Sequence, residues 1–195
     1  MAKPNVVSKR ELIQYAKECL VEKGLEQFTL RAVAETAGVT QGTIYYHFRT
    51  KEQLLLAIVR DICETSWQEI ARPKEDAIAH ALASARSRCS YDSFFHKLFL
   101  SLVASGFNNE EIRHKLGEIM AAENEALSRN LSGLWAASPI EGVSRDTWGI
   151  LINAMVDGLA LQAVLQKDFP VESIYREFEH FLKGLSALTD KEGKK

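Results

Sequence analysis

Apolar residues recur at helical spacing along almost the whole chain, and this periodicity constrains the fold more than any other feature. Leu12, Ile13, Ala16 and Leu20 are separated by the intervals that place side chains on one face of an α-helix. Later apolar runs, such as residues 94–103, are too long for strands and fit helical spacing better. The sequence therefore predicts an all-α protein.

Capping residues, glycines and prolines divide the chain into about nine expected helices. Ser8 and Glu11 form a capping-box pattern, and Thr29, Thr40 and Thr50 can cap the helices that follow them. The expected helix ends include Gly24, Gly38 and Pro73. The predicted ranges are 8–23, 30–37, 41–48, 51–72, 75–88, 92–106, 109–136, 144–167 and 171–188.

Charge is distributed unevenly along the chain. Residues 1–51 carry eight Lys or Arg and five Asp or Glu, whereas the other 144 residues carry 16 and 21. A basic segment joined to an acidic body is typical of a nucleic-acid-binding module attached to a domain of another kind. We expect a DNA-binding domain in 1–51, a linker helix over 51–72 and a second domain in 73–195.

Residues 29–48, TLRAVAETAGVTQGTIYYHF, have the pattern of a helix-turn-helix. Two short helices are expected to meet at a tight turn, where Gly38 permits a positive φ. The second helix begins with Thr40, Gln41 and Thr43, small or polar residues that can approach base edges. In a recognition helix this N-terminal part lies deepest in the major groove.

Several side chains around the second short helix can donate hydrogen bonds to phosphate oxygens. Tyr45, Tyr46 and His47 lie within it, and Arg49 and Lys51 follow at the start of the next helix. At a helix start, free backbone N–H groups and the helix dipole also favour an anion. The segment is therefore predicted to combine one reading helix with several phosphate contacts.

The stretch from about residue 9 to residue 62 resembles the DNA-binding domain of TetR-family bacterial transcriptional repressors. The resemblance rests on Phe28-Thr29, Leu30-Arg31-Ala32-Val33-Ala34, Ala37-Gly38-Val39, Gly42-Thr43-Ile44-Tyr45-Tyr46-His47-Phe48 and Lys51-Glu52-Gln53-Leu54-Leu55. It implies a homodimer on a palindromic operator in double-stranded DNA, dimerised through the last two long helices. It also implies that a small ligand entering the C-terminal domain releases the DNA.

Carried across position by position, the resemblance assigns nine DNA contacts. We expect base contacts from Gln41, Thr43 and Tyr45. Phosphate contacts are expected from Thr29, Tyr46, His47 and Lys51, and either kind from Arg31 and Thr40. The alternatives are that Tyr45 and Phe48 pack in the core and that Lys51 is a solvated charge. No ligand partner stands at metal-binding spacing from His47, so no metal is predicted.

The two last long helices carry apolar stripes that suit a four-helix interface between subunits. The expected interface residues are Leu151, Met155, Leu159, Gln162, Phe178, Phe181, Leu182 and Leu185. The alternative is that these stripes pack within one subunit.

A ligand site is expected where polar side chains interrupt apolar helix faces rich in aromatic residues. The candidates are Trp67, Phe95, His96, Phe99, Asn124, Asn153 and Asp157. Most of these aromatic residues can equally be core. Asp157 would favour a cationic ligand, but the sequence selects no particular effector.

Other function classes receive little support. The G-x-S-x-G, P-loop, G-x-G-x-x-G and H-E-x-x-H patterns are absent, so no enzyme and no cofactor is predicted. Cys19, Cys63 and Cys89 leave a redox-sensing regulator as an alternative trigger. An activator is the alternative to a repressor, because the sign of regulation depends on operator position.

The expected location is the bacterial cytoplasm, with the protein on the nucleoid when it binds DNA. Three cysteines suit a reducing compartment, and the first residues lack an apolar stretch of signal-peptide type. By inspection, no apolar run approaches the roughly 20 residues that span a membrane, so no membrane partner is expected.

Overall fold

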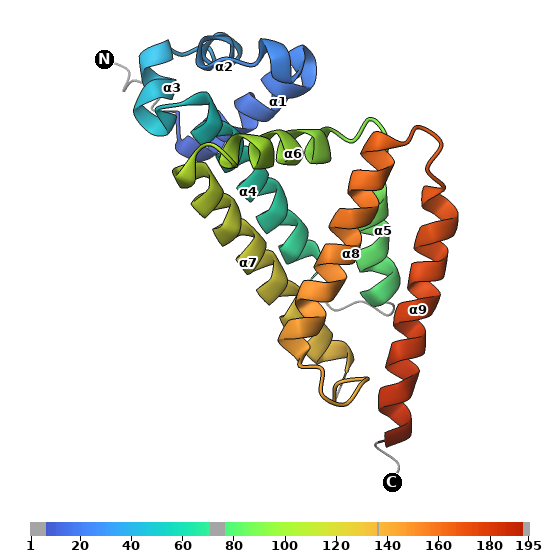
Figure 1. Ribbon diagram of the computed structural model, residues 1–195. Coiled ribbons are helices and arrows are strands. Elements are labelled where there is room, and N and C mark those ends of the chain that lie inside the picture. Colours follow the sequence, from blue (N-terminus) through green and yellow to red (C-terminus); the bar gives the residue numbers. More distant parts are fainter. Residues whose placement is uncertain (1–6, 71–76, 136, 193–195) are drawn as a thin grey trace. The chain divides into compact units, whose positions relative to one another are not determined.

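The computed structural model describes residues 7–70, 77–135 and 137–192. These residues form nine helices and no strand, which confirms the predicted all-α fold (Figure 1). The helices are α1 (Lys9–Gln27), α2 (Leu30–Ala37), α3 (Gln41–Phe48), α4 (Lys51–Ile70), α5 (Ala77–Arg88), α6 (Phe94–Gly106), α7 (Glu110–Leu134), α8 (Arg145–Leu165) and α9 (Val171–Glu192).

The predicted caps begin the N-terminal helices. Ser8 and Glu11 form the reciprocal capping box of α1, with the Ser8 N–H donating to the Glu11 carboxylate over 2.7 Å. Thr29 Oγ1 accepts from a backbone N–H of α2 at 3.0 Å, and Thr40 Oγ1 does the same for α3 at 3.2 Å. Thr50 Oγ1 accepts the Gln53 N–H at 3.1 Å and so caps α4. Side-chain oxygens thereby satisfy donors that the first helical turn leaves free.

Some predicted helix ends need correction. Gly24 has φ 73° and ψ 171°, which is non-helical, but the chain resumes helical geometry and α1 continues to Gln27. A single residue with positive φ therefore kinks this helix without ending it. Helix α6 begins at Phe94, two residues later than predicted, and α9 extends to Glu192, four residues further. The predicted stop at Pro73 lies outside the described residues.

The chain forms two compact units. Unit 1 comprises Met1–Ile62 with Leu98–Leu116, and unit 2 comprises Cys63–Lys97 with Gly117–Lys195. The boundaries fall inside α4, α6 and α7, so each of these helices contributes residues to both units. The inclusion of 98–116 with the N-terminal helices was not indicated by the periodicity.

Unit 1 is built around the three short N-terminal helices and the first part of α4. Helix α1 packs against α2, and α2 packs against α3. The side chains of Phe28, Val33, Ile44, Leu54 and Ile58 are completely buried. Their burial supplies the apolar contacts that hold α3 in place.

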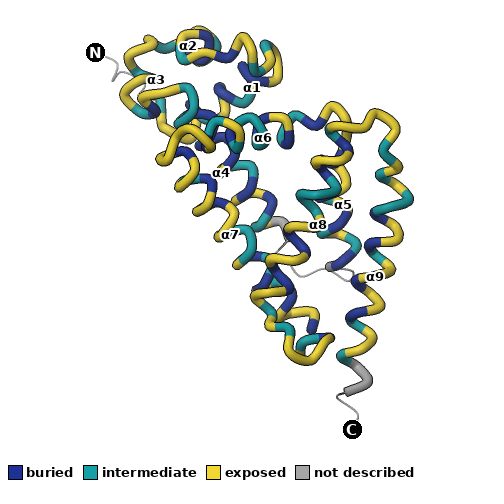
Figure 2. Tube along the Cα trace, viewed as in Figure 1, coloured by how far each residue is buried: buried dark blue, intermediate teal, exposed yellow. Residues whose placement is uncertain are grey.

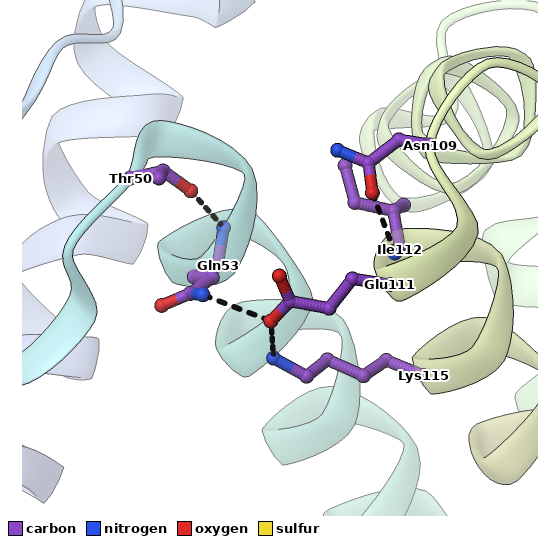
Figure 3. Close-up of polar contacts among 6 residues, drawn as sticks. All are labelled: Thr50, Gln53, Asn109, Glu111, Ile112 and Lys115. Carbon is purple, nitrogen blue, oxygen red and sulfur yellow. Dashed lines mark hydrogen bonds and ion pairs between the residues drawn. The ribbon is translucent and has the colours of Figure 1, made fainter.

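Polar contacts join the start of α4 to the start of α7 within unit 1 (Figure 3). Gln53 Nε2 donates to Glu111 Oε1 over 3.0 Å, and Lys115 Nζ donates to the same oxygen over 2.6 Å. The hydrogen bond and charge of Lys115 are the main reasons that the pKa of Glu111 lies below its usual range. Asn109 caps α7 by accepting the Ile112 N–H at 3.2 Å.

Unit 2 has its own apolar core, contributed by α5, α7, α8, α9 and Trp135. Trp135 and Trp148 meet edge to face, with ring centroids 5.7 Å apart. Their indole N–H groups donate to Ser186 Oγ at 2.7 Å and to Ser138 Oγ at 3.1 Å, respectively. Figure 2 shows buried and exposed residues recurring along α8 and α9, as expected for helices that bury one face.

Helix α8 is more apolar than inspection of the sequence suggested. Among the described helices, α8 alone is long and apolar enough to cross a membrane, judged by length and composition. Its mean hydropathy is 1.5 over 18 residues. The expectation of no such run was therefore wrong. Core helices of water-soluble proteins pass the same test, and α8 contributes Ile152, Ala160 and Ala163 to the core of unit 2.

The crossing of α7 and α8 leaves no room for a side chain at Gly149. A Cβ atom there would lie 2.6 Å from the Asn124 carbonyl oxygen and 3.1 Å from the Ser128 amide nitrogen. We expect Gly149→Ala to lower the free energy of unfolding by about 1–3 kcal/mol, because the backbones must separate. Urea unfolding followed by circular dichroism measures this change.

Gly117→Ala is the matched control, since a Cβ at Gly117 of α7 meets nothing within 4 Å. This variant is expected to gain about 0.5–1 kcal/mol from higher helix propensity. Equal effects of the two substitutions would contradict the close crossing at Gly149.

Candidate nucleic-acid interface and ligand cavity

The turn between α2 and α3 is built around Gly38. This residue adopts the left-handed conformation, with φ 64° and ψ 29°. Its N–H donates to the Glu35 carbonyl at 3.3 Å, and the Val39 N–H donates to the Ala34 carbonyl at 3.0 Å. These bonds close the C-terminus of α2 and direct the chain into α3.

The N-terminal turn of α3 is polar and accessible. Thr40 and Gln41 are exposed, and Thr43 is half-buried. The hydroxyl oxygens of Thr40 and Thr43 lie 3.0 Å apart. A groove runs along this end of the helix, lined by Val7, Val39, Thr40, Gly42, Thr43, Tyr46 and His47. The groove therefore offers hydroxyl groups and small residues that base edges can approach.

The tyrosines of α3 project from the surface. The exposed fraction is 52% for Tyr45 and 71% for Tyr46, which disfavours the alternative that Tyr45 is core. Phe48, in contrast, is 2% exposed and packs in the core. The Arg49 guanidinium lies over both tyrosine rings, 5.4 Å and 6.0 Å from their centroids. His47 is half-buried, and its ring meets that of Tyr46 edge to face.

Arg49 was considered as a phosphate donor but was not among the nine contacts that the resemblance assigned. It ends α3 with φ 60°, a conformation that is uncommon for residues other than glycine. The Arg49 guanidinium is thereby held over the exposed rings of Tyr45 and Tyr46 on the reading helix. The signal in the sequence was a basic residue directly after the aromatic run.

The remaining predicted contacts surround α3. Thr29 and Arg31 are exposed, and Arg31 Nε pairs with Glu35 Oε1 at 3.0 Å. Lys51 Nζ donates to the Leu25 carbonyl oxygen at 2.9 Å. Lys51 therefore ties the start of α4 to the end of α1, and its ammonium group retains two further donors.

Unit 2 contains a cavity of about 500 Å³, within the range of sites that hold small molecules. It lies among the end of α4, the length of α5 and parts of α7, α8 and α9. Of the predicted pocket residues, Trp67 and Asn153 line it. Its charged lining residues in the described part of the chain are Arg88, Glu123 and Arg129, none of which was predicted.

Burial raises the pKa values of two carboxyl groups, Glu123 of the cavity wall and Asp157 of α8. Loss of solvent contact and the nearby Asp157 raise the pKa of Glu123 to about 7. Loss of solvent contact likewise raises the pKa of Asp157 to about 6. The Arg88 charge lowers both values without cancelling the effect of burial. The Trp67 indole N–H also lowers the pKa of Glu123, but it forms no hydrogen bond of normal geometry with a described residue.

The other predicted pocket residues lie elsewhere or bind each other. His96 is buried, and its Nδ1 lies 2.9 Å from both Ser93 Oγ and the Arg88 carbonyl oxygen. The Phe95 ring lies under the Arg88 guanidinium, whereas Phe99 belongs to unit 1. Asn124 Oδ1 accepts a hydrogen bond of 2.9 Å from Asn153 Nδ2.

The residues expected at a dimer interface fall into two groups. Leu151, Met155 and Phe181 are each 43% exposed, Gln162 is also exposed, and Leu159 is half-buried. Phe178, Leu182 and Leu185 belong to the core of unit 2, and Leu182 also lines the cavity. Between α8 and α9 lies a shallow groove that includes Met155, Gly158, Leu159, Gln162, Ile174, Phe178 and Phe181.

The three cysteines are buried and free. Burial raises the pKa of Cys63 to about 12 and also raises that of Cys89. A thiol is reactive mainly as the thiolate, so such environments disfavour oxidation. Within the described ranges, no cluster of three or more His, Cys, Asp or Glu side chains can hold a metal ion.

Helix α3 is capped by Thr40 and presents polar and aromatic side chains at the surface of a small helical unit. This arrangement is that of a helix-turn-helix DNA-binding protein. The family model for bacterial regulatory proteins of the tetR family matches residues 12–58. Residues 12–58 are therefore a DNA-binding domain of the TetR type, and the comparisons support a TetR-family transcriptional regulator.

Curated relatives agree with this assignment. The transcriptional repressor KstR2 of Mycolicibacterium smegmatis is 25% identical over 166 residues, which cover 85% of this chain and 71% of the relative. The fatty acid metabolism regulator of Bacillus subtilis is 30% identical over 56% of this chain and 59% of its own length. The repressor AcnR of Corynebacterium diphtheriae is 34% identical, over 37% of this chain and 40% of AcnR.

Solved structures share the fold. GusR of Salmonella enterica matches with a TM-score of 0.65 at 18% identity, covering 94% of this chain and all of GusR. FadR of Bacillus subtilis in complex with stearoyl-CoA matches with a TM-score of 0.64 at 20% identity, covering 90% of this chain and 97% of FadR.

Removing one hydroxyl group from α3 tests the phosphate assignment. We expect Tyr46→Phe to weaken binding of every duplex by a similar factor, about tenfold, because a hydrogen bond to a charged phosphate is lost. Gln41→Ala is expected instead to change preference at particular base pairs. Fluorescence anisotropy with a panel of duplexes measures both effects.

Tyr91→Phe is the control, because Tyr91 is an exposed tyrosine of unit 2. It should leave affinity unchanged. A loss for Tyr46→Phe that is confined to one base pair would make Tyr46 a base-reading residue.

Proposed function

We propose that this protein is a repressor that binds a palindromic operator as a homodimer and releases it when a small molecule enters the cavity of unit 2. The observation that carries the proposal is the exposed N-terminal half of α3, with its paired threonine hydroxyls and projecting tyrosines. The transcriptional repressors among its relatives support the same function. Whether a bound regulator represses or activates depends on where its operator lies relative to the promoter.

Exposed apolar side chains support dimerisation through α8 and α9. Ile150, Leu151, Met155, Leu161 and Phe181 are each more than 40% exposed. A concentration of apolar residues at the surface favours an interface with another protein. A two-fold axis through this face would bring two copies of α3 to successive major grooves if they stood about 34 Å apart.

A small molecule can control such a dimer only by binding one conformation better than another. The cavity supplies a binding site. Helices α4 and α7 each contribute residues both to the cavity and to unit 1, so a change at the cavity can be transmitted along them. Helix α4 carries Lys51 near the DNA-binding residues and Trp67 at the cavity, and α7 carries Glu111 in unit 1 and Glu123 at the cavity. A ligand that shifts these helices would change the spacing of the reading helices.

The environments of Cys63 and Cys89 favour a ligand over oxidation as the trigger, because their raised thiol pKa values leave little thiolate. Regulation of transcription also implies the bacterial cytoplasm as the location, with the protein on the nucleoid while it holds DNA.

Selection from random duplexes tests the proposed function directly. We expect the purified protein to retain a palindromic sequence whose half-sites are centred about one helical turn apart, because each α3 reads one major groove. Sequencing of the retained pool gives the motif. Enrichment of a single, non-palindromic half-site would contradict binding as a dimer, and retention without any motif would contradict sequence-specific regulation.

Charge placed on the α8–α9 face tests dimerisation. We expect Phe181→Glu and Met155→Glu to give monomers, because an interface cannot bury unpaired carboxylates cheaply. Sedimentation velocity measures the mass, and circular dichroism checks the fold. Phe107→Glu is the control, since Phe107 is 73% exposed and lies outside α8 and α9. A dimer that survives both interface substitutions would rule out this face.

A further inference from the structure

We propose that Arg49 is a further DNA-binding residue, whose guanidinium is held beside the reading helix α3 by a strained turn and binds a phosphate of the DNA backbone. The inference rests on the proposed function, because it adds a contact to the same DNA-binding surface. It goes beyond the nine assigned contacts, since it follows from the backbone and ring geometry at Arg49.

The turn at Arg49 joins α3 to α4 within two residues. The Arg49 N–H donates to the Tyr45 carbonyl oxygen at 3.0 Å and so closes α3. The next N–H, that of Thr50, donates to the Phe48 carbonyl oxygen at 2.6 Å. With φ 60° and ψ −53° at Arg49, the three residues form a γ-turn of the rare, strained kind that has a positive φ at its centre.

Packing on both sides of the turn holds this conformation in place. Phe48, before the turn, is 2% exposed, and Leu54, after it, is completely buried. Thr50 follows Arg49 directly and caps α4, because its Oγ1 accepts the Gln53 N–H at 3.1 Å. Neither helix can therefore shift to relax Arg49 without losing core contacts or a cap.

Glycine would adopt this backbone conformation with less strain than arginine. Every other residue with a positive φ in the described part of the chain is a glycine, and Arg49 is the exception. Strained residues of this kind concentrate at functional sites, where the side chain is needed in that position. The turn itself gains nothing from an arginine, so we look to the side chain for its role.

The Arg49 side chain lies against the exposed aromatic residues of α3. Its guanidinium carbon is 5.4 Å from the centroid of the Tyr45 ring and 6.0 Å from that of Tyr46. These contacts restrict the side chain to one region of the surface before any DNA binds. They also leave the N–H donors of the guanidinium available for oxygen acceptors, which a planar fork can bind in pairs.

No acid among residues 7–70, 77–135 and 137–192 competes for these donors. Arg31 of α2 pairs with Glu35 at 3.0 Å, whereas no carboxylate of the described residues pairs with Arg49. Arg49 is also exposed. A cation that is held in place but not neutralised suits an anionic partner.

The position of Arg49 at the end of α3 favours a phosphate over a base edge as that partner. The N-terminal part of a recognition helix lies deepest in the major groove, so its C-terminal end lies nearer the DNA backbone. Tyr46 and His47, which directly precede this end, line the groove beside α3. Arg49 would thus extend the row of phosphate contacts proposed for these two residues.

Substitutions that separate charge from side-chain shape test the assignment. Fluorescence anisotropy gives the affinity of the full-length protein for the duplex recovered by selection and for a random duplex, at about 50 to 300 mM salt. We expect Arg49→Gln to weaken both duplexes about tenfold, because a charge-assisted hydrogen bond is lost. The slope of log affinity against log salt should fall by about 0.9, the value for one phosphate, whereas Arg49→Lys should keep the slope.

Stability separates a DNA contact from a structural role. Arg49→Gly should bind DNA as weakly as Arg49→Gln but unfold at a higher urea concentration, because glycine relieves the positive φ. Arg113→Gln is the control, since it removes an exposed charge from α7 of the same unit. This variant should change neither the affinity nor the salt slope.

The assignment is overturned if Arg49→Gln leaves affinity and slope unchanged, if its loss spares the random duplex, or if Arg49→Gly unfolds at a lower urea concentration than Arg49→Gln. These failures leave the proposed function intact as long as the unsubstituted protein binds the selected duplex. If the unsubstituted protein binds neither duplex at low salt, the proposed function fails, and the role of Arg49 fails with it.

Discussion

The free N–H groups at the first turn of each helix are the constraint on which much of this structure depends. In a chain made almost entirely of helices, the residue that satisfies those donors also decides where each helix begins. Thr29, Thr40 and Thr50 do this for three consecutive helices. Thr40 does more, because its hydroxyl also lies beside Thr43 in the groove at the start of α3. One side chain thus sets the position of the reading helix and forms part of its polar surface.

The sequence predicted the helices well because their signals are local. A cap, an apolar period and a glycine act within a few residues, so nine helices could be placed, with ends that differ by up to four residues. Gly24 misled the prediction because a positive φ permits a kink as readily as a stop, and only the packing of α1 decides between them. The helix-turn-helix was equally predictable, since its residues are contiguous.

The cavity was harder to predict because five helices from distant parts of the chain assemble it. Aromatic content pointed to Phe95 and Phe99, which do not line it, and overlooked Arg88 and Glu123. A signal for Glu123 was nevertheless present. It follows Ile112, Leu116 and Ile119 at intervals of three and four residues, so it occupies an apolar stripe of α7. An acid in such a stripe must be buried or partnered, and here it faces a cavity.

The raised pKa values of Glu123 and Asp157 also bear on how long the protein survives in a cell. Each acid holds its proton more tightly in the folded protein than in the unfolded chain. For Glu123 the stability that this provides is complete below the unfolded pKa of 4.5 and is lost as pH rises through about 7, and for Asp157 the corresponding values are 3.8 and about 6. Near pH 7 the protein therefore bears the cost of burying charge. Cellular proteases cut proteins in proportion to how often they open, so a ligand that neutralises this charge would lengthen the lifetime of the regulator. The abundance of the protein would then depend on the concentration of such a ligand.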